Sequence, residues 1–194
     1  MKTPLRYQIT EFDCGTVSLV NCISFLFERE EIPAELIKEI SIYTLDCYDD
    51  KGNLGQGGTS RAAVKQLSEW MQAFSAEKNL GVSCKYFKGK NVDIEKIKNC
   101  INSGGCVNLR SYLIDTEHYV MITNIDDKFV YMFDPYYLEK DYFQNCDKDI
   151  SLIEGEKYAM NRKVGIDYFN SAMENQDLTL GPINKREILL INKS

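Results

Sequence analysis

Several residue patterns that mark common functional classes are missing from this chain of 194 residues. Its seven cysteines include no Cys-x-x-Cys pair, and a single histidine, His118, is the one imidazole that could join them. Structural zinc sites need about four such ligands at short spacings, so the sequence predicts no zinc centre. We expect no metal and no cofactor.

Long apolar runs and basic clusters are also missing. No stretch approaches the roughly eighteen apolar residues of a membrane helix, and the N-terminus has no apolar stretch of signal-peptide length. The formal net charge is -6 and the basic residues are scattered, so we expect no nucleic-acid partner. With an odd number of cysteines, these absences predict a cytoplasmic protein with reduced thiols and no membrane segment.

The remaining pattern divides the chain into a helical half, about residues 1–80, and a strand-rich half, about residues 81–194. Helical periodicity predicts one helix from Cys14 to about Arg29 with Asp13 as N-cap, one from Pro33, and one capped by Thr59. Strand patterns, with a short helix capped by Asp93 between the first two, cover residues 82–87, 106–113, 118–125, 129–133 and 186–191. The expected fold class is α+β, with the helical half packed on a mostly antiparallel sheet in a single domain, 1–194.

Cys14 is the candidate nucleophile because it stands at the expected start of the first helix. A thiol attacks as the thiolate, and the free amides and dipole of a helix N-terminus lower its pKa. Gly15 leaves this turn uncrowded. His118 would complete the activation by forming a thiolate–imidazolium pair, and any step that needs imidazole has to use it.

Asp134 is the candidate group that orients His118. Residues 118–125 and 129–133 read as a hairpin, and reflecting 118 about a turn centred near 126 and 127 gives 134 to 135. Gln8 lies six residues before Cys14 and could point its amide across the nucleophile. Together with the Cys14 main-chain N–H, it would stabilise an oxyanion.

This order of residues resembles the papain-like cysteine peptidases that remove double-glycine leader peptides, best known from bacteriocin-processing ABC transporters. There, as here, the glutamine lies six residues before the cysteine, the histidine opens a strand, and the aspartate stands in an Asp-Pro pair after the next strand. The resemblance covers residues 8–26 and 118–135. It implies a papain-like fold, Cys14 as nucleophile, His118 as base and acid, Asp134 as orienting group and Gln8 as oxyanion donor. It also implies a peptide or amide substrate and leaves open a partner transporter.

Three functions stay open at this point. The chain could hydrolyse a peptide through an acyl-thioester, or transfer the acyl group to an amine or thiol, as the phytochelatin synthases do. A non-catalytic peptide-binding relative is the third, although the presence of all four site residues argues against it. The tyrosines Tyr136 and Tyr137 are expected to pack rather than to contact substrate. The sequence does not indicate which oligomeric state the protein adopts.

Overall fold

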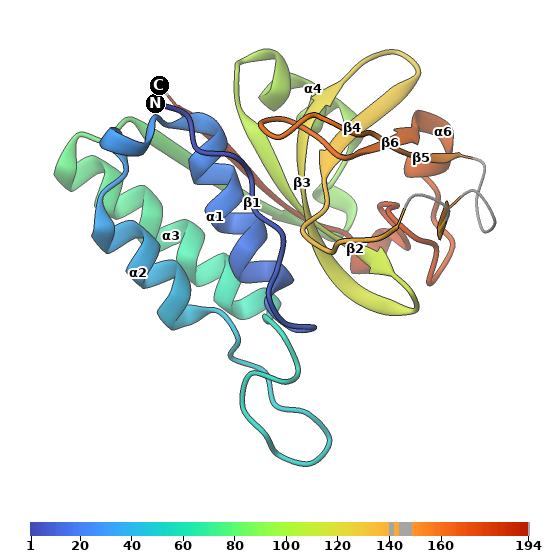
Figure 1. Cartoon of the computed structure of the whole chain (residues 1–194), viewed down its shortest axis with the longest axis horizontal. Coiled ribbons are helices and arrows are strands. Elements are labelled where there is room, and N and C mark those ends of the chain that lie inside the picture. Colours follow the sequence, from blue (N-terminus) through green and yellow to red (C-terminus); the bar gives the residue numbers. More distant parts are fainter. Residues whose placement is uncertain (140–141, 144–148, 194) are drawn as a thin grey trace.

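The computed structural model describes residues 1–139, 142–143 and 149–193, and it joins a group of helices to one antiparallel sheet (Figure 1). The α+β class and the packing of the helical half on the sheet are therefore confirmed. In chain order the principal elements are α1 (Cys14–Leu26), α2 (Ala34–Tyr43), α3 (Arg61–Lys78), β1 (Val82–Lys88), α4 (Ile94–Asn102), β2 (Cys106–Leu113), β3 (Thr116–Ile125), β4 (Phe129–Phe133), β5 (Ile150–Leu152), β6 (Arg162–Gly165), α6 (Ile166–Phe169) and β7 (Glu187–Lys193). None of the helices in the described ranges is both long and apolar enough to cross a membrane.

The helix ends differ from the sequence prediction in three places. α1 ends at Leu26 rather than near Arg29, because Phe27 is already extended. The N-cap of α3 is Ser60, whose hydroxyl accepts from the Ala63 N–H at 3.0 Å, so the assignment of Thr59 was wrong. Asp13 precedes α1 as expected but makes no side-chain cap. Asp93, by contrast, caps α4 through the Lys96 N–H.

The sheet has the strand order β1-β7-β2-β3-β4-β6-β5, which places β2 and β3 near its centre. The five strand patterns of the sequence correspond to β1, β2, β3, β4 and β7. The short strands β5 and β6 were missed. Because β7 pairs with both β1 and β2, the C-terminal strand joins β1 to the rest of the sheet.

Strand β3 is buried on both faces, and its side chains alternate between two hydrophobic clusters. Tyr119 and Met121 pack beneath α1, α2 and α3, whereas Val120 and Ile122 pack with residues of α4 and of the C-terminal segment. The first residue of α1 therefore lies against the strand that carries His118. The loop between α2 and α3 extends away from this body (Figure 1).

Candidate active site

Cys14 is the first residue of α1 and lies between two small cavities. It is 8% exposed. One cavity, of about 170 Å³, is also lined by His118 and Tyr136. The other, of about 190 Å³, is bordered by the glycine-containing loop before α3. The thiol is thus held on a rigid element and opens onto space for a reacting group.

The carboxylate of Asp13 folds the segment just before Cys14. It accepts the N–H groups of Ile9 and Thr10 at 3.1 and 2.8 Å and the Thr10 hydroxyl at 2.7 Å. Its main-chain carbonyl meanwhile accepts the Val17 N–H at 2.9 Å, the first hydrogen bond of the helix. Because the Asp13 carboxylate accepts hydrogen bonds from the preceding loop, it does not cap α1, and the first main-chain N–H groups of the helix remain available to other acceptors.

His118 lies between Cys14 and Asp134. Its Nε2 is 2.7 Å from Asp134 Oδ1, and both side chains are buried. The imidazole is also within hydrogen-bonding reach of the Cys14 thiol. With Nε2 engaged by the carboxylate, the other ring nitrogen is left to face the sulfur, which gives the linear order that a thiol–imidazole–carboxylate mechanism needs.

The strand register that suggested the His118–Asp134 contact was wrong, although the contact is present. Met121 pairs with Phe133, the last residue of β4, so continuing this register aligns Asp134 with Val120. The turn is centred later than expected, because the Asp126 N–H bonds to the Phe129 carbonyl. A side chain that follows the end of β4 still reaches back to the imidazole.

Asp134 is held by three neighbours that the sequence analysis did not identify. Its Oδ1 also accepts the Tyr136 N–H at 2.8 Å, and its Oδ2 lies 3.2 Å from Arg162 Nη2. The Asn161 side chain accepts the Asp134 N–H at 2.7 Å and donates to its carbonyl at 2.8 Å. The hydrogen bonds therefore hold Asp134 in position, and the positive charge of Arg162 favours the ionised form of its carboxyl group.

The three charges of the site stabilise one another against burial. Burial would raise the pKa of the Cys14 thiol, but His118 and the main-chain N–H of Tyr119 lower it. Burial would lower the pKa of His118, yet Asp134 first and Cys14 second raise it to about 10. The pKa of Asp134 is raised by burial but lowered overall by His118 and Arg162. All three shifts therefore act toward the charged form of each group: thiolate, imidazolium and carboxylate.

Gln8 lies next to this site but its amide is engaged elsewhere. Its Nε2 donates to the Thr10 carbonyl at 2.6 Å, and its main-chain N–H donates to the Pro135 carbonyl at 2.9 Å. The second bond ties Gln8 to the segment that carries Asp134. To donate to an oxyanion, the amide would exchange Thr10 for the substrate by a side-chain rotation.

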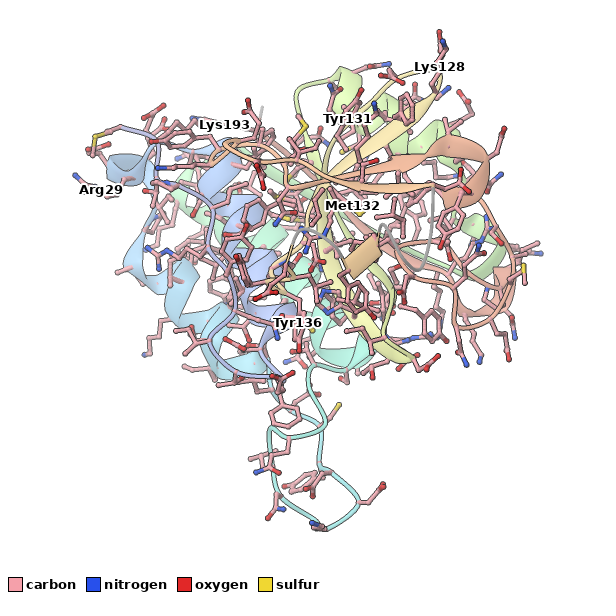
Figure 2. The ribbon with its side chains drawn as sticks, turned by 45° about the vertical axis from the view of Figure 1, so that its right-hand side comes forward. Arg29, Lys128, Tyr131, Met132, Tyr136 and Lys193 are labelled. Atoms are coloured by element: carbon pink, nitrogen blue, oxygen red, sulfur yellow. The ribbon has the colours of Figure 1, made fainter. Side chains whose placement is uncertain are left out.

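Tyr136 packs, as expected, and the ring that it packs against is that of His118. Its ring meets that of His118 edge-on, with centroids 6.2 Å apart, and its hydroxyl donates to Glu11 at 2.9 Å. Figure 2 shows Tyr136 where the helical half meets the strands. Glu11 and Tyr136 both line the first cavity of Cys14. The tyrosine-rich segment after Pro135 was the only sequence signal for this residue, and it lacked any period.

The second cavity of Cys14 is lined by a charged network. Arg61 pairs with the buried carboxylate of Glu187 at 3.2 Å, and Tyr119 donates to the same carboxylate at 3.1 Å. Arg110 pairs with Glu117. The charges are balanced within the network, and it ties the start of α3 to the central strands.

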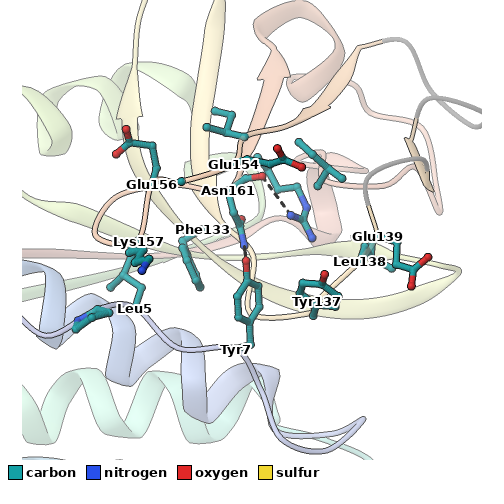
Figure 3. A pocket seen from close by; sticks show the side chains of 15 residues that line it. Leu5, Tyr7, Phe133, Tyr137, Leu138, Glu139, Glu154, Glu156, Lys157 and Asn161 are labelled. Atoms are coloured by element: carbon teal, nitrogen blue, oxygen red, sulfur yellow. Dashed lines mark hydrogen bonds between the residues drawn. The ribbon is translucent and has the colours of Figure 1, made fainter.

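A larger cavity of about 700 Å³ lies on the other side of Asn161 and Arg162 (Figure 3). Leu5 and Tyr7 of the N-terminal segment face the loop between β5 and β6 across it, and the Asn161 amide approaches the Tyr7 hydroxyl at 3.4 Å. Its lining does not include Cys14. Within residues 1–139, 142–143 and 149–193, no three metal-binding side chains form a group that could hold an ion.

The six cysteines of the described ranges are free thiols: Cys14, Cys22, Cys47, Cys84, Cys100 and Cys106. Burial raises the pKa of Cys84 to about 12 and that of Cys100 to about 11, which keeps them protonated. Cys146 lies outside the described residues. The pKa of Cys14 is lowered, whereas the pKa values of Cys47, Cys84, Cys100 and Cys106 are raised.

Neither family models nor curated proteins match this chain. Among solved structures, it is similar to a double glycine motif protease from an AMS/PCAT transporter, crystallised in complex with the leader peptide. The two are 13% identical, the match covers 98% of this chain and 91% of that chain, and the TM-score is 0.49. The roles of individual residues therefore rest on the geometry described above.

Proposed function

We propose that this chain is a papain-like cysteine peptidase that cleaves a peptide through an acyl-thioester on Cys14. The observation that supports this most strongly is the buried imidazole of His118, with Asp134 on one side and Cys14 on the other. Burying a charged group destabilises the fold unless an oppositely charged group pairs with it. Here the partners of the imidazole raise its pKa while it lowers that of the thiol, which is the arrangement a thiolate nucleophile requires.

In this mechanism the Cys14 thiolate attacks the carbonyl carbon, and the electron pair of the C=O bond moves onto oxygen. The main-chain N–H of Cys14 and, after rotation, the Gln8 amide would donate to that oxyanion. His118 then gives its proton to the leaving amine as the C–N bond breaks. A water molecule, deprotonated by His118, attacks the thioester and releases the acid and the thiol sulfur.

The resemblance of the motifs favours a peptide with a double-glycine leader as the substrate. Gly57 and Gly58 of this chain belong to the loop beside Cys14 and line its second cavity, and we interpret them as loop residues rather than as a cleavage signal. A transporter as partner is part of the same proposal. Acyl transfer to an amine shares the first half of the mechanism and is distinguished by the acceptor.

The test incubates the whole chain with peptides that carry a Gly-Gly junction, and with the same peptides lacking it, with and without an added amine. Mass spectrometry identifies the products. We expect cleavage after the junction to give a free carboxylate, and we expect Cys14→Ala to reduce the rate about 10⁶-fold. Amide products in the presence of the amine would assign acyl transfer instead. Unchanged cleavage by the Cys14→Ala protein would contradict both enzymatic functions.

A further inference from the structure

Among the residues that the structure describes, Arg162 is the largest fully buried side chain, and it is the first residue of β6. It is 2% exposed, and its guanidinium contacts several groups of the site segment. Nη2 donates to the Tyr136 carbonyl at 2.9 Å, and Nη1 donates to the Asn161 carbonyl at 3.2 Å. The ring of Phe143 lies 5.8 Å from the guanidinium carbon. A guanidinium fixed on so many sides is a permanent charge in one place, because Arg does not lose its proton in proteins.

This charge is directed at the one Asp134 oxygen that the imidazole does not use. Oδ1 receives both His118 Nε2 and the Tyr136 N–H, whereas Oδ2 lies 3.2 Å from Arg162 Nη2. Within the described part of the chain, Oδ2 makes no hydrogen bond. The contact is thus an ion pair, and it is the interaction through which the protein holds Oδ2.

We infer that Arg162 is a positioning residue of the thiol site, acting on Cys14 and His118 through Asp134. The inference rests on the proposed function of that site. A carboxylate paired with Arg162 stays ionised and turned toward the imidazole, so the imidazole stays protonated and the thiol stays a thiolate. Arg162 also lines the 700 Å³ cavity behind the site (Figure 3), where the carboxylates of Glu139, Glu154 and Glu156 surround the same space.

Other charged and titratable groups also face the reacting pair, and they form a background that Arg162 variants leave in place. They are Glu11, Glu117 and Tyr136 in the smaller cavity, and Cys47, Arg61 and Arg110 in the neighbouring one.

The test measures the second-order rate of iodoacetamide alkylation at Cys14 as a function of pH, by peptide mass mapping of the whole chain. The acid limb of this profile is the low-pH region in which the rate falls because the Cys14 thiolate becomes protonated. In Arg162→Met this limb should move to higher pH. Below the limb, the rate should fall about tenfold for each unit of that movement. In Arg162→Lys the acid limb should lie close to its wild-type pH, because the lysine ammonium again places a positive charge beside Asp134. In an Asp134→Asn background, Arg162→Met should move the limb no further, since Arg162 acts through that carboxylate.

Arg186 provides a matched control. It is also buried, and its guanidinium donates to the carbonyls of Gly181 and Asn170 and to the Asn170 side chain. Arg186→Met should therefore weaken the fold while leaving the limb in place. If Arg162→Met does not fold, Arg162→Gln is used instead as the neutral variant.

A folded neutral variant at position 162 whose acid limb matches that of the wild type would overturn the inference. Equal movement in the Asp134→Asn background would overturn it as well. Failure of the proposed function is a different result: there, Cys14 of the wild type would itself alkylate no faster than Cys47.

Discussion

At the scale of single residues, the site is a chain of charges in which each group sets the protonation of the next. Arg162 faces Asp134, Asp134 faces His118, and His118 faces Cys14. His118 and Cys14 exchange one proton, so the folded pair holds the same number of protons as an unfolded thiol with a neutral imidazole. This equality determines how stability depends on pH.

Between about pH 6.5 and 8.5 the unfolded chain holds the proton on Cys14 and the folded chain holds it on His118, so the pair contributes no slope. Above that range the unfolded thiol ionises, and the stability from the raised pKa of His118 is lost as the pH approaches about 10. In Cys14→Ser the serine holds its proton in both states. The raised pKa of His118, kept up by Asp134, then makes stability fall from about pH 6.5 upward, with a slope of up to about 1.4 kcal/mol per pH unit.

Urea unfolding of both proteins at intervals between pH 6 and 9 measures this difference. In the wild type, this pair should leave the free energy of unfolding unchanged across the range. In Cys14→Ser, the free energy of unfolding should fall as the pH rises. Parallel curves for the two proteins would show that Cys14 and His118 do not share a proton.

The proximity of Cys14, His118 and Asp134 could be predicted from the sequence, because the chain has one histidine and an Asp-Pro pair follows the next strand. Arg162 could not, because it is far along the chain and its neighbours show no periodicity. An arginine in such a segment looks like any exposed basic residue until the fold buries it against a carboxylate.

At the scale of elements, the start of α1 is where the site is most closely packed. A Cβ at Gly15 would lie 2.7 Å from the Thr59 side chain, so the segment before α3 rests directly on the first turn of the helix. Gly15 was expected to leave this turn uncrowded, but the space it leaves is filled by Thr59. A glycine is required here for close approach rather than for an unusual φ angle.

Gly15→Ala should therefore lower the free energy of unfolding by about 1–3 kcal/mol through overpacking, and should slow alkylation of the adjacent Cys14. The double variant with Thr59→Ala, which removes the Thr59 Oγ1 at 2.7 Å and the methyl group at 3.2 Å, should regain part of the loss. Urea unfolding and iodoacetamide labelling measure the two effects. A Gly15→Ala protein as stable and as reactive as the wild type would contradict the close packing.

Among the strands, the long periodic ones were predictable and the short ones were not. β2 and β3 show eight to ten residues of strand pattern, whereas β5 and β6 have three and four residues and are formed by pairing with β4 and with each other. The register of β3 on β4 depended on the Asp126 turn, whose hydrogen bonding the composition of the turn did not specify.

At the scale of the whole molecule, the helical and strand-rich halves share one core. Tyr119, Met121 and Leu189 of the sheet pack in the same cluster as Leu19 of α1 and Leu67 of α3. The site lies across this junction, with Cys14 on the helical side and His118 on the sheet. Separation of the halves would remove both the core and the site.

The single domain 1–194 remains a prediction, and its unfolding should be one cooperative transition. Trp70 is the only tryptophan, and it stacks on Phe74 with ring centroids 4.7 Å apart, so its fluorescence reports on the helical half. We expect urea curves from Trp70 fluorescence and from far-ultraviolet circular dichroism to coincide. A fluorescence transition that precedes the loss of secondary structure would show that the halves unfold separately.

The most direct measurement of the central claim is the rate at which iodoacetamide labels Cys14 at pH 6, with Cys47 of the same chain as internal reference. Cys47 is half-buried and its pKa is raised, first by burial and then by the charge of Asp46, so it serves as an unactivated thiol. The thiolate–imidazolium pair predicts labelling of Cys14 at least about tenfold faster than Cys47, and loss of that advantage in His118→Asn. Equal rates at the two cysteines, or an advantage that persists without His118, would contradict the account.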